Sequence, residues 1–393
     1  MRCRLLPLVV ALLAGALSLP AHAQAPAAPT APTAPAAAPA RLSVVFVNPG
    51  KTGEIFWELV NHSMRAAASQ LNIDVETLWA QRNYRQMQEL GLDVVNRATK
   101  PDYLVLVNEE NAALPIMQAA ESAGVKTMLL ANALTGRAFE EFGGPQEKLK
   151  TWIASLVPDL DEAGARMARA LVSVARARDL RSSDGKIHLL ALGGDDSTPT
   201  SVARTNGLMR VVGENSDVVI DRLLFANWNE TEAERLTANF LQWAQRRDIN
   251  IAGVWAANDP MAFGAMNAAK RVGYVPGKDL IVVGLNWSPS AVRRVLAGEM
   301  LLTDGGHFMG GALSMMLLRD HADGCDLSAG KGALIFKTSP VTQMRANTAL
   351  FFVGERQFEQ LDFNKLRQAS KGTCGARDFS VGALLDAAMF AGD

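Results

Sequence analysis

From Arg41 onward, short apolar runs alternate with amphipathic segments. The first run, Leu42–Val47, is rich in β-branched residues and ends at Asn48-Pro49-Gly50. Apolar residues then recur at helical spacing from Val60 to Leu71. A short apolar run bounded by turn residues is typical of a buried strand, and the 3.6-residue spacing is typical of a helix with one buried face. The pattern therefore predicts a strand followed by a helix.

The same alternation continues along most of the chain. Further strands are expected at 75–78, 103–107, 127–130, 186–192, 218–226, 251–257 and 280–285, with helical patterns between them. Strands that alternate with helices at this spacing predict parallel βαβ units with right-handed crossovers and helices on both faces of the sheet.

One segment, from Asn132 to Pro158, interrupts the alternation. It contains Gly136, the sequence Gly143-Gly144-Pro145 and several charged residues, and we interpret it as a crossover between domains or an elaborated loop. Similar α/β patterns lie on either side of it. The sequence therefore predicts an α/β protein with two doubly wound parallel-sheet lobes joined by a hinge.

The beginning of the chain has a different composition. Two arginines precede the apolar run Leu5–Leu19, which is too short for a comfortable membrane span, and Ala21-His22-Ala23 is typical of a cleavage site. We expect residues 1–23 to be a signal peptide, residues 24–40 an Ala/Pro-rich linker, and the mature protein to be periplasmic. A retained membrane anchor is the alternative, which the length of the run disfavours.

The charge of the chain is nearly balanced, with 39 basic and 40 acidic side chains. A bulk nucleic-acid binder would carry a basic excess, so no nucleic-acid partner is expected. Removal of the signal peptide would leave 37 basic and 40 acidic side chains, because it takes away two of the arginines. It would also leave two cysteines, Cys325 and Cys374. In an oxidising compartment these form a candidate disulfide, and two unpaired thiols remain the alternative.

Candidate binding residues follow the predicted strands, because ligands of open α/β sheets bind beyond the carboxyl ends of the strands. These positions hold Glu54, Phe56, Trp57, Asn132, Arg204, Trp228, Asn258, Asn286 and Asp304. Asp195 and His307 also follow strands, and we assign them no contact. Amides and carboxylates exchange hydrogen bonds with hydroxyl groups, and indole rings cover apolar faces. The set therefore predicts a small polar ligand, while a turn or helix-cap role is the alternative for each Asn and Asp.

The sequence matches motifs of enzymes less well than it matches a ligand-binding set. Gly50-Lys51-Thr52 lacks the upstream glycine of a phosphate-binding loop, and no Gly-x-Ser-x-Gly sequence occurs. The histidines lack the spacing of metal ligands. We therefore expect no enzyme, no cofactor and no metal site.

Four stretches resemble a known family. Asn258-Asp-Pro-Met-Ala-Phe-Gly-Ala265 and Val282-Val-Gly-Leu-Asn286 look like motifs of the type I periplasmic binding proteins of the ribose and galactose kind. Thr200–Gly207 resembles the arginine-bearing helix start of that family, and Phe56-Trp57 resembles its paired aromatics. The resemblance extends from about Leu42 to about Phe336.

The resemblance implies two lobes that are joined by three hinge crossings and close on a small ligand. It places residues 41–134 and 306–337 in an N-terminal lobe and 135–305 in a C-terminal lobe, and leaves 338–393 as an extension that packs on the body. The implied function is that of a monomeric solute-binding protein that captures a small polar, sugar-like ligand for the permease of an ABC importer. The alternative is a LuxP-like sensor that reports to a membrane histidine kinase or cyclase.

The sequence also differs from this family at several positions. Sugar binders of the family usually carry Asp-Arg where this chain has Ala131 and Asn132, and an acid where it has Asn286. Glu54 replaces an amide. The family's usual set of sugar contacts is therefore not intact. Transcriptional repressors share the fold but need an N-terminal helix-turn-helix, and the expected signal peptide occupies that end.

Overall fold

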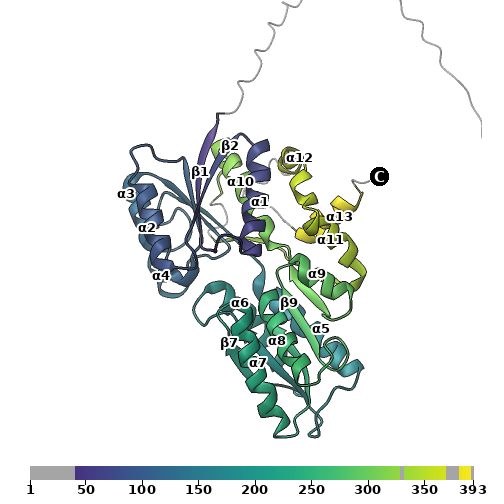
Figure 1. Cartoon of the computed structure of the whole chain (residues 1–393). Coiled ribbons are helices and arrows are strands. Elements are labelled where there is room, and N and C mark those ends of the chain that lie inside the picture. The colour runs from purple at the N-terminus through teal and green to yellow at the C-terminus, as the bar shows by residue number, and fades with distance from the viewer. Residues whose placement is uncertain (1–39, 328–331, 369–379, 391–393) are drawn as a thin grey trace, which may run out of the picture. The chain divides into compact units, whose positions relative to one another are not determined.

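Two six-stranded sheets lie at the centre of the structure (Figure 1). The computed structural model describes residues 40–327, 332–368 and 380–390. The first sheet has the strand order β11-β5-β4-β3-β1-β2 and the second the order β12-β10-β9-β8-β6-β7. Neighbouring strands are parallel, except that β12 runs antiparallel to β10. The predicted pair of α/β lobes is therefore confirmed.

The first sheet contains β1 (Leu42–Asn48), β2 (Ile73–Trp79), β3 (Tyr103–Leu106), β4 (Lys126–Leu130), β5 (Trp152–Pro158) and β11 (Leu334–Phe336). The second contains β6 (Ile187–Gly193), β7 (Val218–Phe225), β8 (Ile251–Ala256), β9 (Ile281–Leu285), β10 (Leu302–Gly305) and β12 (Ser339–Thr342).

The first lobe also contains α1 (Ile55–Gln70), α2 (Tyr84–Val95), η1 (Glu109–Asn111), α3 (Leu114–Ala123), α4 (Gly136–Phe142), η2 (His307–Met309) and α10 (Gly310–Ala322). The second lobe contains α5 (Leu160–Ala177), α6 (Pro199–Gly213), α7 (Glu230–Gln245), α8 (Asp259–Arg271) and α9 (Pro289–Leu296). A C-terminal group follows: η3 (Gln343–Arg345), α11 (Ala346–Gly354), η4 (Gln357–Gln360), α12 (Phe363–Gln368) and α13 (Val381–Phe390).

Alternate residues of the strands face two different layers of helices. In β1, Val44 and Phe46 join the cluster that contains α1, whereas Val45 and Val47 join the cluster of α2 and α3. Because both faces of the sheet are covered, nearly every position of β1 is buried. This explains why the strands appear in the sequence as continuous apolar runs rather than alternating ones.

The chain passes between the two lobes three times. It crosses from β5 to α5, from β10 to η2, and from β11 to β12. The second crossing contains Gly305 and Gly306, with φ angles of 147° and 81°. A Cβ atom at Gly305 would lie 2.9 Å from the backbone of Asn286, so this crossing needs glycine for both conformation and space.

Two boundaries differ from those expected. The segment Asn132–Pro158 holds α4 and β5, and β5 pairs with β4, so this part of the expected C-terminal lobe belongs to the first sheet. The run Trp152–Pro158 is almost wholly buried, but the glycines and charges before it hide it in the sequence. Residues 339–342, expected in the extension, form β12 and complete the second sheet.

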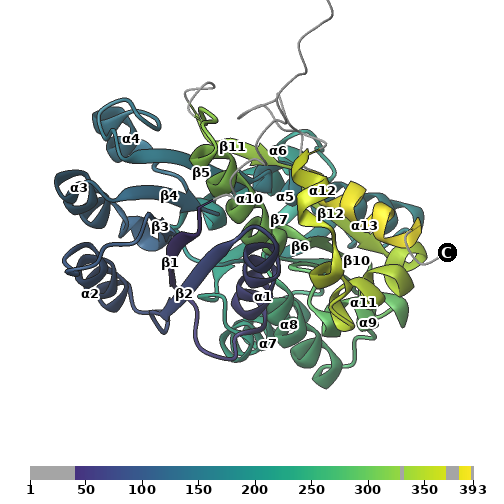
Figure 2. The same ribbon diagram turned by 90° about the horizontal axis from the view of Figure 1, so that it is seen from above.

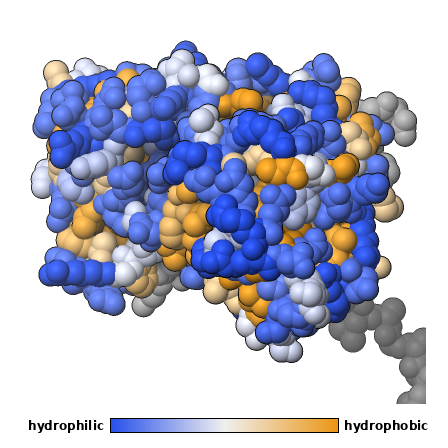
Figure 3. All heavy atoms as spheres, turned by 60° about the horizontal axis from the view of Figure 1, so that its bottom comes forward, coloured by the Kyte–Doolittle hydropathy of each residue, from blue (hydrophilic) through white to orange (hydrophobic). Residues whose placement is uncertain are grey.

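Most of the segments expected near the two ends of the chain lie outside the described residues. The expected signal peptide (1–23) and all of the expected linker (24–40) except its last residue lie outside the described residues. Cys325 is disulfide-bonded, and its expected partner Cys374 also lies outside them. Within the described residues, no helix combines the length and the apolar character that a membrane span needs. The face in Figure 3 carries apolar groups scattered among hydrophilic ones.

A buried histidine joins strand β6 to the neighbouring edge strand β7 in the second sheet. His188 in β6 is held between Asp221 of β7, 3.0 Å from its Nδ1, and Asp184, 3.1 Å from its Nε2. Burial lowers the pKa of His188, but the hydrogen bonds and charges of the two aspartates outweigh it, so its pKa is raised above 6.5. The protonated ring can donate to both carboxylates.

This arrangement predicts a pH-dependent contribution to stability. A histidine whose folded pKa is raised contributes fully below its unfolded pKa, and the contribution disappears as the pH rises through the folded pKa. We therefore expect the difference in unfolding free energy between the wild type and His188→Gln to be largest near pH 6 and to shrink by about pH 9. Urea unfolding across this range measures it. A difference that stays constant with pH would contradict the assignment.

Candidate functional site

The carboxyl ends of the two sheets come into contact across the lobes. Asn132, after β4, accepts a 2.9 Å hydrogen bond from the backbone N–H of Thr200 in α6 and a second from its hydroxyl. The backbone N–H of Glu110 donates to the hydroxyl of Thr198 over 3.5 Å. Predicted residue Asn132 therefore joins the lobes, and these contacts show the lobes together at the edge where the candidate residues lie.

A chain of stacked and bonded side chains connects the lobes beside these contacts. The ring of Phe56 in α1 stacks on His307, with centroids 4.5 Å apart and planes inclined by 29°. Nη2 of Arg204 in α6 lies 3.1 Å from Nε2 of His307, and the guanidinium of Arg204 lies 5.4 Å from the centre of the Trp228 ring. Trp57 meets Phe56 edge-on at 5.0 Å. Four predicted residues thus come together around one that had no assigned contact, His307.

The protonation state of His307 follows from its neighbour. A guanidinium can only donate hydrogen bonds, so Nε2 of His307 accepts and the proton of the neutral ring lies on Nδ1. Burial, and then the charge of Arg204, lowers the pKa of His307 well below 6.5. Burial also lowers the pKa of Arg204, to about 9. At neutral pH the pair therefore carries one positive charge, on Arg204.

Three buried nitrogen donors of this group have no partner among the described residues. They are Nε1 of Trp57, Nε of Arg204 and Nδ1 of His307. A buried donor without an acceptor costs about 1–3 kcal/mol, so native proteins rarely keep several of them together. The arrangement is suited to a bound molecule that brings hydrogen-bond acceptors and has a face for the aromatic rings.

The predicted residue Glu54 belongs to a second cluster, at the rim of the first lobe. Arg82 donates to both oxygens of Glu54, over 2.9 Å from its Nε, and also to Glu109. Its guanidinium lies 5.9 Å from the centre of the Trp57 ring. Burial opposes the charge of Arg82, but the two carboxylates together raise its pKa. Arg82 and Glu109 line a small pocket with Pro49.

Burial also affects the second carboxylate of this cluster. Glu109 has its pKa raised by burial, and its Oε2 has no partner among the described residues. An oxygen of this kind can exchange a hydrogen bond with a hydroxyl group that enters the pocket.

Two predicted contacts, Asn258 and Asp304, have other partners, while a contact from Asn286 stays a prediction. Asn258 caps α8: its Oδ1 accepts from the N–H of Met261 over 2.9 Å, and its Nδ2 donates to the Trp228 carbonyl. It therefore has the cap role that was the alternative. Asn286 is buried, and no side-chain hydrogen bond of it occurs within the described residues. Asp304, fully buried, is occupied by other side chains and is not available to a ligand.

The partner of Asp304 is Arg166, which connects all three crossings between the lobes. Arg166 donates to Asp304 at the end of β10 over 3.0 and 3.1 Å, and to Asp159 after β5 over 3.3 Å. It also donates to the hydroxyl of Thr338, between β11 and β12. Burial raises the pKa of Asp304, and Arg166 opposes this shift. No sequence pattern indicates this role of Arg166, because Asp304 and Thr338 lie 138 and 172 positions from it along the chain.

Comparisons with known proteins agree with this geometry. A family model described as a periplasmic binding protein domain matches residues 44–325. The D-allose-binding periplasmic protein of Escherichia coli is 24% identical over 250 residues, which are 63% of this chain and 74% of that protein. The D-apiose import binding protein of Actinobacillus succinogenes is 32% identical over 129 residues, 33% of this chain and 39% of that protein.

A solved structure is also similar over most of its length. The crystal structure of a periplasmic sugar-binding protein from Pseudomonas fluorescens matches with a TM-score of 0.76 and 31% identity. The match covers 88% of this chain and 99% of that one.

The contacts of Arg166 predict that its loss strongly lowers the free energy of unfolding. Removing Arg166 as Arg166→Met leaves Asp304 buried without its cation, which we expect to cost about 3–5 kcal/mol in unfolding free energy. The matched control is Arg169→Met in the same helix, whose exposed ion pair with Glu162 contributes at most about 1 kcal/mol. Urea unfolding followed by tryptophan fluorescence measures both. Equal losses in the two variants would contradict the role of Arg166.

Proposed function

This chain belongs to the periplasmic binding protein family, and we propose that it captures a small polar, sugar-like ligand between its lobes and delivers it to an ABC importer. We place this activity in the periplasm, with the permease as the membrane partner and the protein as a monomer. The family match and the names of the relatives support this proposal.

The observation that carries the ligand class is the group of unpartnered donors between the lobes. Trp57, Arg204 and His307 each bury an N–H that finds no acceptor among the described residues, and Phe56 and Trp228 place ring faces beside them. Sugar hydroxyls and ring oxygens accept hydrogen bonds, and the C–H faces of a sugar ring pack against aromatic rings. A sugar-like molecule therefore provides hydrogen-bond acceptors for the buried N–H groups and an apolar face for the aromatic rings.

The mechanism that follows is closure of the lobes around the ligand. Phe56 lies on the first lobe, Arg204 lies on the second, and His307 follows a crossing between them. A ligand that contacts all three binds the closed form better than the open form, so it shifts the population towards closure. The permease would then recognise the closed form.

Two other functions receive no such support. The relatives described above are binding proteins by name, including one for import, so they favour transport over a LuxP-like sensor. They also favour binding over catalysis, and the unpartnered donors need no reaction to explain them. The departures at Ala131, Asn132 and Asn286 remain, and we infer that the contacts to the ligand differ from those of the common pentose and hexose binders.

The proposal predicts a bound sugar and a dominant contact from Arg204. Mass spectrometry of the small molecules released by denaturing the purified protein should identify a sugar or polyol, with D-allose and D-apiose as reference compounds. Calorimetric titration with the identified compound should show that Arg204→Gln weakens binding at least tenfold, about 1.4 kcal/mol.

The control for this experiment lies on the same helix. Arg210 is exposed and pairs with Asp161, so Arg210→Gln should leave the affinity within about twofold of the wild type. Retention of the wild-type affinity by Arg204→Gln would show that the site is wrong. Release of no sugar, together with no response to either reference sugar, would argue against the ligand class.

A further inference from the structure

The C-terminal group of helices lies against both lobes. We call residues 343–368 and 380–390 the C-terminal strap. It begins after β12, beyond the residues 44–325 that the family model matches. Figures 1 and 2 both show α11 near α9 of the second lobe and α12 on the side of α1 of the first lobe. The contacts of the strap are therefore informative about how the lobes move.

One end of the strap is fixed to the second lobe. Helix α11 packs against α9, and α13 packs against β12. Arg345, directly before α11, donates to the hydroxyl of Ser339 in β12 over 3.2 Å and to the carbonyl of Gly382 in α13 over 3.4 Å. Arg345 thus joins the two ends of the strap to the edge strand of the second sheet.

The middle of the strap is fixed to the first lobe. Gln70, the last residue of α1, donates from its side chain to the carbonyl of Leu361 and accepts from the N–H of Phe363, both over 2.9 Å. Its backbone carbonyl accepts from the side chain of Asn364 over 3.1 Å. One residue of the first lobe therefore holds three consecutive parts of the strap. A second attachment comes from Arg367, which donates to Asp320 of α10.

Between these attachments the strap covers the hinge. The buried ring of Phe358 meets Phe308, which follows the second crossing, at 5.0 Å, and Phe352 of α11 at 5.8 Å. A Cβ atom at Gly306 would lie 2.3 Å from a methyl group of Val381. The N–H of Val381 also donates over 2.9 Å to the carbonyl of Lys337 in the third crossing.

We propose that the C-terminal strap is a conformational device that favours the closed arrangement of the lobes and thereby sets how readily the protein opens. The strap is attached to α1 and to β12 in the same structure in which Asn132 and Thr200 join the two lobes. A rotation that separates the lobes changes the path between α1 and β12, so it must loosen one attachment or disturb the packing over Gly306. The strap contacts therefore stabilise the closed form selectively.

This device acts on affinity without touching the ligand. When only part of the free protein is in the binding-competent form, the apparent affinity falls in proportion to that part. A strap that raises the closed population brings ligand binding closer to its intrinsic affinity. The inference concerns the ligand-free protein, so it can fail while the proposed function stands, and the reverse also holds.

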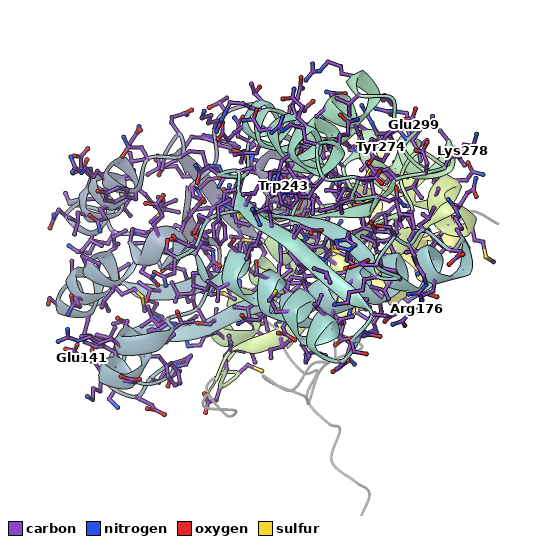
Figure 4. The ribbon with its side chains drawn as sticks, turned by 90° about the horizontal axis from the view of Figure 1, so that it is seen from below. Glu141, Arg176, Trp243, Tyr274, Lys278 and Glu299 are labelled. Carbon is purple, nitrogen blue, oxygen red and sulfur yellow. The ribbon has the colours of Figure 1, made fainter. Side chains whose placement is uncertain are left out.

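The test compares the two attachments in the full-length protein. We expect Gln70→Ala and Arg345→Ala each to raise the ratio of open to closed ligand-free protein about fivefold. The first variant loses two side-chain hydrogen bonds from α1 to the strap, and the second loses one from the strap to β12 and one that joins its two ends. Small-angle X-ray scattering should show a larger radius of gyration in both variants. Spin labels at positions 141 and 278, which lie on opposite sides of the molecule in Figure 4, should give a shifted and broader distance distribution.

The two readouts separate a strap from a merely stabilising tail. If the C-terminal residues only stabilise the fold, both substitutions should lower the melting temperature without changing the scattering or the spin-label distances. That result would overturn the proposal. An effect of Gln70→Ala without one of Arg345→Ala would also overturn it, because a strap needs both attachments. The matched control is Gln118→Ala in α3, an exposed glutamine remote from the strap, which should leave the distances unchanged.

Discussion

The partly buried interaction of Arg166 with the three crossings is the constraint on which the two-lobe arrangement depends. Asp159, Asp304 and Thr338 lie on different crossings, and one guanidinium donates to all of them. A planar guanidinium with five donors in a fixed fork can satisfy several acceptors at once, which a lysine could not do with the same geometry. The crossings are therefore held at a common point.

The same contacts also explain where the candidate site lies. His307 follows Gly305 and Gly306 directly, so the same crossing that Arg166 holds through Asp304 places the imidazole between Phe56 and Arg204. Because His307 is neutral, it accepts a hydrogen bond from Arg204 without adding a second buried charge. The single charge on Arg204 then lies against the Trp228 ring and the carbonyl of Ala257, and no carboxylate of the described part of the chain is bonded to it.

Much of the fold could be predicted because the information is local. An apolar run followed by a helical pattern determines each βαβ unit, and this pattern identified both lobes. The strand β5 was missed because the Gly- and charge-rich segment before it resembles a loop, and only its pairing with β4 and β11 reveals it. The short β12 is not visible in the sequence, because four residues carry too little periodicity to indicate a strand.

The sequence indicates the aromatic and arginine residues of the candidate site but not the hydrogen-bonding partners of its polar residues. Phe56, Trp57, Arg204 and Trp228 follow strands, and a strand end is visible in a sequence. Whether a polar strand-end residue is free depends on partners that are distant in the chain. Arg82 is 28 positions from Glu54, and Arg166 is 138 positions from Asp304. Periodicity carries no information about such pairs, so Asp304 looked like a ligand contact although it belongs to the hinge.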